Sequence, residues 1–303
     1  MKRDFLAIES LSTEELRSVL DRAAKMKADR RPSDVLAGRS IGMIFEKPST
    51  RTRVSFEVGI TELGAKAVVL GAAELQLGRG ETIEDTARVL SRYLHALVVR
   101  TFEQDRLERL AHWGSIPVIN ALSDLMHPCQ ALADLQTVQE HFGTLEGLTL
   151  TYVGDGNNVA HSLMTGCAMV GMNVSVATPA GYEPISQIVK RAEEIAAGTG
   201  ARVTVTTDAA AAAEGADVLY TDVWASMGQE REAEERKLIF APYQVNAALL
   251  ARAKPTAIAL HCLPAHRGEE ITDDVIEGPQ SMVWDQAENR LHAQKALLEW
   301  LLT

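Results

Sequence analysis

Residues 48–53, in the order Pro-Ser-Thr-Arg-Thr-Arg, concentrate hydroxyl and guanidinium groups in one short segment, called here the oxyanion turn. The apolar run 41–45 before it is typical of a buried strand, and apolar residues after it recur at helical spacing until Gly64. The turn is therefore predicted where a strand passes into a helix, where backbone N–H groups lack helical partners and favour an anion. Arg51 is the natural bidentate anchor for phosphate, and the alternative is a capped helix with solvated arginines.

Three further polar residues are predicted at the ends of neighbouring strands. His127 and Gln130 surround Pro128, which suits the first position of a helix and follows the strand-like residues 116–120. Arg100 ends another apolar run. Because ligands of open α/β sheets gather at the carboxyl ends of strands, these side chains are expected to converge with the oxyanion turn.

Two more clusters follow apolar runs in the second half of the chain. Residues 222–228 read Asp-Val-Trp-Ala-Ser-Met-Gly after the strand-like run 216–220. Residues 261–264 read His-Cys-Leu-Pro after the strand-like run 257–260. Both clusters therefore also stand where a parallel sheet presents side chains to a ligand.

These motifs together resemble those of the aspartate/ornithine transcarbamylase family. Its carbamoyl phosphate signature combines Ser-Thr-Arg-Thr-Arg with His-Pro-x-Gln and His-Cys-Leu-Pro, and the Asp-x-x-x-Ser-Met-Gly pattern is similar to that of its ornithine branch. The resemblance runs nearly the full length in the family's order and includes residues 86–90, 154–158 and 288–290. It implies transfer of the carbamoyl group of carbamoyl phosphate to the side-chain amine of L-ornithine, giving L-citrulline and phosphate.

The resemblance also implies roles for particular residues. The carbamoyl phosphate site would comprise Ser49, Thr50, Arg51, Thr52, Gln76, Arg100, His127, Gln130, Cys262, Leu263 and Arg290. The ornithine site would comprise Asn158, Asp222, Ser226 and Met227. The catalytic residues among them would be Arg51, Arg100, His127, Asp222 and Cys262. Gln76 is expected to reach across from a neighbouring subunit, which implies a homotrimer with shared active sites.

No metal or organic cofactor is expected, because the leaving phosphate can itself accept the proton of the amine. Cys129, Cys167 and Cys262 lack the spacing of metal ligands or of a disulfide framework. The segment 154–158 resembles a dinucleotide-binding turn, but Val159 replaces the third glycine of that fingerprint. The sequence also lacks a Walker A motif, so nicotinamide binding and ATP-dependent phosphoryl transfer are both disfavoured.

Composition restricts the possible partners and location. A net charge of -11 argues against nonspecific binding to nucleic acid or to an anionic membrane. The apolar residues 5–8 are too few for a signal peptide, and no run approaches the ~20 residues that span a bilayer. A soluble, cytoplasmic protein is expected.

The alternation of strand-like and helix-like segments predicts an α/β protein of two doubly wound parallel-sheet domains, with the active site in the cleft between them. The expected boundaries are 1–140 for a carbamoyl phosphate-binding domain and 141–285 for an ornithine-binding domain. By the resemblance, the C-terminal helix 286–303 packs back on the first domain. Residues 281–284 are predicted as a strand and residues 227–236 as a mobile surface loop.

Other functions remain open from the sequence. A related enzyme would carbamoylate another amine, such as acetylornithine or putrescine, whereas Asp222 would repel aspartate. A noncatalytic module that only binds carbamoyl phosphate would need less of the carbonyl-activating set than Arg51, Arg100, His127 and Cys262 provide. Cys262 itself has the alternative of an inert buried thiol.

Overall fold

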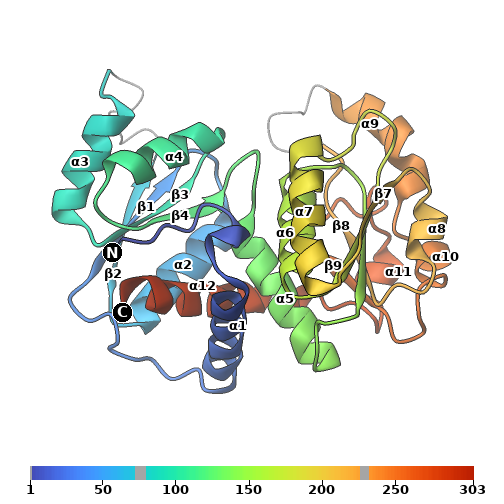
Figure 1. Ribbon diagram of the computed structural model, residues 1–303, viewed down its shortest axis with the longest axis horizontal. Coiled ribbons are helices and arrows are strands. Elements are labelled where there is room, and N and C mark those ends of the chain that lie inside the picture. The colour runs from blue at the N-terminus through green and yellow to red at the C-terminus, as the bar shows by residue number, and fades with distance from the viewer. Residues whose placement is uncertain (1, 72–79, 226–231) are drawn as a thin grey trace. The chain divides into compact units, whose positions relative to one another are not determined.

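The computed structural model describes residues 2–71, 80–225 and 232–303 (Figure 1). The chain divides into two compact units, one formed by Met1–Gln136 with Asn289–Thr303 and the other by Thr137–Glu288. Every strand pair in the described residues is parallel, and helices separate the strands along the chain. The predicted fold class of two parallel-sheet α/β domains is confirmed.

The first unit is built on a sheet that has four strands in the described residues, in the order β2-β1-β3-β4. The strands are β1 (Ser40–Phe45), β2 (Lys66–Gly71), β3 (Ala96–Arg100) and β4 (Val118–Leu122). The helices that begin or lie in this unit are η1 (Ile8–Ser10), α1 (Thr13–Ala28), α2 (Thr50–Glu62), α3 (Ile83–Tyr93), α4 (Gln104–Trp113) and α5 (Pro128–Phe142). The last helix of the chain, α12 (Val283–Leu302), contributes its residues from Asn289 onward.

Strands β1, β3 and β4 of this unit are buried on both faces, which is why they read as near-continuous apolar runs, whereas the edge strand β2 is only partly buried. On one face, Leu97 and Val99 of β3 belong to a core cluster with Leu107 and Leu110 of α4. The order of the strands reverses between β1 and β3, since β1 continues to β2 on one side and β3 to β4 on the other. The oxyanion turn follows β1, and Arg100 is the last residue of β3, so both stand at this topological switch point.

The second unit is built on a sheet that has five strands in the described residues, in the order β7-β6-β5-β8-β9. The strands are β5 (Thr149–Val153), β6 (Asn173–Ala177), β7 (Val203–Thr206), β8 (Val218–Thr221) and β9 (Ile258–His261). The helices are α6 (Asn158–Met169), α7 (Ser186–Thr199), α8 (Ala209–Ala213), α9 (Ala233–Phe240), η4 (Ala241–Tyr243), α10 (Ala247–Leu250) and α11 (Asp273–Ile276). The switch point of this sheet lies between β5 and β8.

Both faces of the second sheet are covered by helices. Val153, Leu219 and Ala259, on three adjacent strands, share a core cluster with residues of α8, α10 and α11. In Figure 1, α6 and α7 lie together in front of this sheet. The segments after β5, β8 and β9 therefore emerge at one edge, and these are the segments that carry the predicted ornithine-site motifs.

Two local predictions were wrong. Residues 281–284 do not form a strand, because Ser281 makes a single bridge to Ala259 and the chain enters α12 at Val283. Residues 227–231 of the predicted surface loop lie outside the described residues, but α9 begins at Ala233, inside the predicted loop. Arg236 in this helix is buried, because its guanidinium finds hydrogen-bond partners inside the unit.

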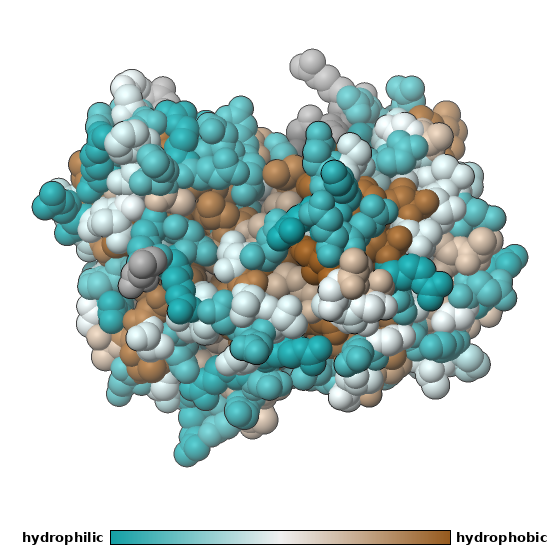
Figure 2. All heavy atoms as spheres, viewed as in Figure 1, coloured by the Kyte–Doolittle hydropathy of each residue, from teal (hydrophilic) through white to brown (hydrophobic). Residues whose placement is uncertain are grey.

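Figure 2 shows one face of the molecule, on which hydrophilic side chains predominate. Over the described ranges, no helix is both long and apolar enough to cross a membrane.

The turn between β5 and α6 allows no side chain at Gly156. A Cβ atom there would lie 2.6 Å from the carbonyl oxygen of Tyr182 and would also overlap the backbone nitrogen of Pro184. We expect Gly156→Ala to lower the free energy of unfolding by about 1–3 kcal/mol, as other overpacking substitutions do.

Chemical denaturation of Gly156→Ala measures this effect, and Gly198→Ala is the matched control. Gly198 lies in α7 with no atom within 4 Å of the added Cβ, so its substitution should instead stabilise by about 0.5–1 kcal/mol. Equal stability of the two variants would contradict the close approach at Gly156.

Candidate active site

The oxyanion turn lies at a strand–helix junction, as predicted. Helix α2 begins at Thr50, and the hydroxyl of Ser49 caps it by accepting the N–H of Thr52 at 3.3 Å. The N–H of Arg53 bonds to the carbonyl of Ser49 at 3.1 Å. The N–H groups of Thr50 and Arg51 therefore point beyond the start of the helix, where an anion is favoured.

Arg290 joins residues from three of the predicted motifs. Its Nη1 donates to Oε1 of Gln130 at 2.7 Å, and its Nη2 donates to Oγ1 of Thr52 at 2.9 Å. The amide nitrogen of Gln130 donates to Asp134, which fixes the amide so that its oxygen faces Arg290. The structure thus brings together Thr52, Gln130 and Arg290, of which the outer two are 238 residues apart in the chain.

His127 lies in the electric field of two arginines. Its side chain is buried, and burial lowers the pKa of His127 well below its usual value. The positive charges of Arg290 and then Arg100 lower the pKa further. The ring is therefore neutral at pH 7, and the surrounding field is positive, which suits a bound oxyanion.

Cys129, next to His127 and Pro128, is not part of this chemistry. Its thiol donates to the carbonyl of Asn120 at 3.3 Å, and burial raises the pKa of Cys129 to about 12. The thiol therefore stays protonated at neutral pH and is a structural group.

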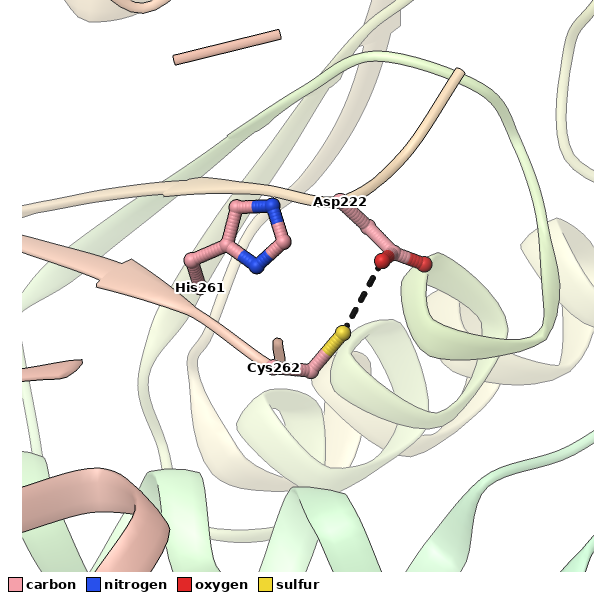
Figure 3. A group of neighbouring side chains, drawn as sticks. All are labelled: Asp222, His261 and Cys262. Atoms are coloured by element: carbon pink, nitrogen blue, oxygen red, sulfur yellow. Dashed lines mark hydrogen bonds between the residues drawn. The ribbon is translucent and has the colours of Figure 1, made fainter. Parts of the chain in front are cut away.

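Asp222 and Cys262 meet in the second unit. The thiol of Cys262 donates to Oδ1 of Asp222 at 2.9 Å (Figure 3). The amide nitrogen of Asn157 donates to Oδ2 of the same carboxylate at 2.8 Å. Asp222 is buried, so these donors replace water around a group that would otherwise be costly to bury. Two predicted residues, from the ends of β8 and β9, are thereby in direct contact.

His261 fixes the backbone beside this pair. Its Nδ1 accepts the N–H of Leu263 at 2.8 Å, so the ring proton lies on Nε2, 3.0 Å from Oε1 of Glu270. The bond to Nδ1 holds Leu263 at φ 58°, a left-handed conformation that a leucine rarely adopts. Leu263 is expected to present its carbonyl to a ligand, and His261 restrains the peptide that carries it.

Asp222, His261 and Cys262 offer atoms within 4.8 Å of one another, a spacing compatible with metal ligands (Figure 3). Both ring nitrogens of His261 are engaged in the contacts to Leu263 and Glu270. A metal ion would have to break one of these contacts to recruit the imidazole. These three side chains therefore favour an organic ligand over a metal ion.

Arg236 ties α9 to the segment that follows β8. Its Nη1 donates to Asp155 at 3.0 Å and to the carbonyl of Trp224 at 2.8 Å, and its guanidinium carbon lies 4.9 Å from the ring centre of Tyr182. Burial raises the pKa of Asp155, and the neighbouring Arg236 opposes that rise. This buried ion pair restrains the chain two residues after Asp222.

The remaining predicted residues are placed as follows. Asn158 is the first residue of α6, and Arg51 is exposed at the start of α2. Gln76, Ser226 and Met227 lie outside the described residues. Sequence reasoning assigned no role to Asn157, although a polar residue directly before a predicted helix is a signal for a helix cap.

His127 predicts a pH dependence of stability. Its pKa is near 6.5 in the unfolded chain and well below this in the folded protein, so protons bind the unfolded chain more readily and stability falls as the pH drops below 6.5. Lowering the pH from 7.5 to 5.5 should reduce the free energy of unfolding by about 1.4 kcal/mol through His127 alone. The His127→Gln substitution should abolish this part of the pH dependence.

The measurement is urea denaturation of both proteins at the two pH values. His141→Gln, at an exposed position, serves as control and should keep the wild-type pH dependence. An equal loss of stability in wild type and His127→Gln would contradict the lowered pKa.

Known proteins are similar to this chain in sequence and fold. Residues 3–140 match the carbamoyl-P binding domain of the aspartate/ornithine carbamoyltransferase family, and residues 146–301 match its Asp/Orn binding domain. The chain is 58% identical over 304 residues to the ornithine carbamoyltransferase of Parafrankia sp., covering 99% of this chain and 96% of that protein. It is 60% identical over 303 residues to that of Acidothermus cellulolyticus, covering 100% and 97%.

A solved structure gives the same result for the fold. The ornithine carbamoyltransferase of Pyrococcus furiosus superposes with a TM-score of 0.95 at 55% identity, covering 98% of this chain and 96% of that chain. The resemblance inferred from the motifs is confirmed. The chain belongs to the aspartate/ornithine carbamoyltransferase family.

Proposed function

We propose that this protein is an enzyme that transfers the carbamoyl group of carbamoyl phosphate to the side-chain amine of L-ornithine, giving L-citrulline and phosphate. The observation that carries the proposal is the full-length identity of 58% and 60% to proteins named ornithine carbamoyltransferase. The charges of the two units support it, because one gathers cations and the other presents a buried carboxylate.

The residues of the first unit bind carbamoyl phosphate in this proposal. The helix start at Ser49, Thr50 and Thr52 holds the phosphate together with Arg51, and Arg100 bridges the phosphate and the carbonyl oxygen. His127, Gln130 and Arg290 complete the carbamoyl side. Donors already aimed at the oxyanion of a tetrahedral intermediate contribute about 2.7–4 kcal/mol each in other acyl transfers.

The residues of the second unit bind the amine acceptor. Asn158, Ser226 and Met227 hold the α-amino and α-carboxylate groups of ornithine, while Asp222 and Cys262 lie next to its side-chain amine. An amine with a pKa near ~10.4 must lose a proton to react, and at pH 8 the neutral form costs about 3.3 kcal/mol. The carboxylate of Asp222 attracts the ammonium form and orients it before that proton leaves.

The reaction then needs only these groups and the two substrates. The lone pair of the amine nitrogen attacks the carbonyl carbon and forms the C–N bond. Arg100 and His127 stabilise the oxyanion, and the carbonyl of Leu263 accepts a bond from the carbamoyl NH₂ group. The C–O bond to phosphate breaks, and the leaving phosphate accepts the proton of the amine, so no metal or organic cofactor is required.

We also propose a homotrimer in which Gln76 enters the site of a neighbouring subunit. Large apolar side chains are exposed on both helices of the first unit that flank β2 in the chain, namely Val54 and Val58 on α2 and Val89 and Tyr93 on α3. Helix α3 follows the segment that contains Gln76.

The trimer is tested by sedimentation equilibrium. A chain of 32.9 kDa should sediment near three times that mass or a multiple of it. Full activity in a species of one chain mass would contradict shared active sites.

The amine acceptor is tested by a competition assay with the purified protein. With carbamoyl phosphate saturating, L-ornithine should be carbamoylated far faster than L-aspartate, because Asp222 attracts a cationic side chain and repels a carboxylate. It should also react faster than acetylornithine and putrescine, because these lack the free α-amino or the α-carboxylate group that Asn158, Ser226 and Met227 are proposed to hold. Citrulline is measured directly. If one of the other three amines reacts faster, that amine replaces ornithine as the proposed substrate. If none of the four amines is carbamoylated, a noncatalytic binding module is favoured.

The oxyanion turn is tested by Arg51→Ala. Loss of charge-assisted hydrogen bonds worth about 1.5–3 kcal/mol should reduce kcat/KM for carbamoyl phosphate by about 10- to 150-fold without unfolding the protein. Arg191→Ala, which removes an exposed arginine from α7, is the matched control and should leave the kinetics unchanged. Wild-type kinetics in a folded Arg51→Ala protein would show that Arg51 does not bind carbamoyl phosphate.

A further inference from the structure

Asn157 connects two elements of the second unit through one side chain. It immediately precedes α6, and its Oδ1 accepts the N–H groups of Val159 at 2.9 Å and Ala160 at 3.2 Å. The hydroxyl of Tyr152 lies 3.3 Å from the same oxygen. Burial raises the pKa of Tyr152, so this hydroxyl stays protonated and is the donor in its hydrogen bond to Oδ1. The oxygen of Asn157 is thereby committed to capping the helix.

The cap determines where the other end of the amide points. Because backbone N–H groups can only donate, the atom facing them is the oxygen, and Nδ2 must face Asp222. It donates to Oδ2 of Asp222 at 2.8 Å, while the thiol of Cys262 donates to Oδ1 at 2.9 Å. The two oxygens of the carboxylate are held by donors from the segments after β5 and β9, on either side of β8.

We propose that Asn157 is a positioning residue that fixes the orientation of the Asp222 carboxylate toward the reacting amine. The inference rests on the proposed carbamoylation of ornithine, in which Asp222 orients the side-chain amine. Without the amide donor, the carboxylate loses the restraint on Oδ2 and can turn about its χ2 bond, because only the thiol of Cys262 still holds it. The cap of α6 thus sets the geometry of a group directly after the adjacent strand β8.

The choice of residue supports this role over a purely structural one. Asparagine, aspartate and serine cap helices about equally well. Asparagine combines a cap oxygen with a nitrogen donor directed the opposite way. Aspartate would keep the cap but set a second negative charge against Asp222, and serine would keep the cap but lose the donor.

Two substitutions at Asn157 therefore distinguish capping of α6 from positioning of Asp222. Both variants keep the cap of α6, but Asn157→Asp should melt below Asn157→Ser because its second carboxylate lies against the buried Asp222. With carbamoyl phosphate saturating, kcat/KM for L-ornithine should fall about 10- to 100-fold in Asn157→Ser, the usual effect of losing a hydrogen bond to a charged group. It should fall further in Asn157→Asp, while KM for carbamoyl phosphate stays unchanged in both.

Asp208→Ala is the matched control, because it removes the side-chain cap of α8 in the same unit. It should lower the melting temperature without changing kcat/KM. Wild-type kcat/KM for ornithine in folded Asn157→Ser and Asn157→Asp would overturn the inference.

A crystal structure of Asn157→Ser gives a readout that does not depend on activity. The Asp222 carboxylate should be rotated or disordered in it, and an unchanged orientation would overturn the inference. If the wild-type protein forms no citrulline, the proposed function fails, and the orientation of Asp222 in this variant still decides the positioning role.

Discussion

A charge buried in this protein must make hydrogen bonds with neighbouring elements, and the candidate site residues of each unit depend on that constraint. An unsatisfied buried charge costs several kcal/mol or more, so each buried ionic group dictates the identity of the residues around it. Arg290 donates to Thr52 and Gln130, and Asp222 accepts from Asn157 and Cys262. The partners in each case come from segments that follow different strands of one parallel sheet.

The two units satisfy this constraint with opposite charges. The first places His127 in the positive field of Arg100 and Arg290, where an oxyanion is favoured. The second holds a carboxylate, where an amine is favoured. Carbamoyl transfer needs both environments, because a multiply charged phosphate must be bound and an amine must be oriented.

The sequence predicted the regular elements well, because strands buried on both faces appear as apolar runs whatever surrounds them. Residues 41–45 and 257–260 were predicted as strands, which the structure contains as β1 and β9, and Pro128 begins its helix as expected. The strand predicted at residues 281–284 was wrong because its apolar pattern also fits the start of a buried helix. Short apolar runs do not distinguish the two.

The site was predicted by its motifs but not by its contacts. The oxyanion turn and the Asp222–Cys262 pair were expected near ligands, whereas the partners of Arg236 were not, since Asp155 lies 81 residues away and a charged segment suggests exposure. Asn157 was overlooked because its second contact, to Asp222, depends on the pairing of β5 with β8. Three parts of the account stay predictions. These are the roles of the site residues, the cleft expected between the two domains, and the contributions of Gln76, Ser226 and Met227.

The most direct test of the division of charge is a crystal structure of the protein with carbamoyl phosphate and L-norvaline, which is ornithine without its side-chain amine. The phosphate should lie within hydrogen-bond distance of the N–H groups of Thr50 and Arg51. The terminal carbon of norvaline should point at Asp222 and Cys262. A phosphate bound away from the oxyanion turn, or a norvaline side chain directed away from Asp222, would contradict the account.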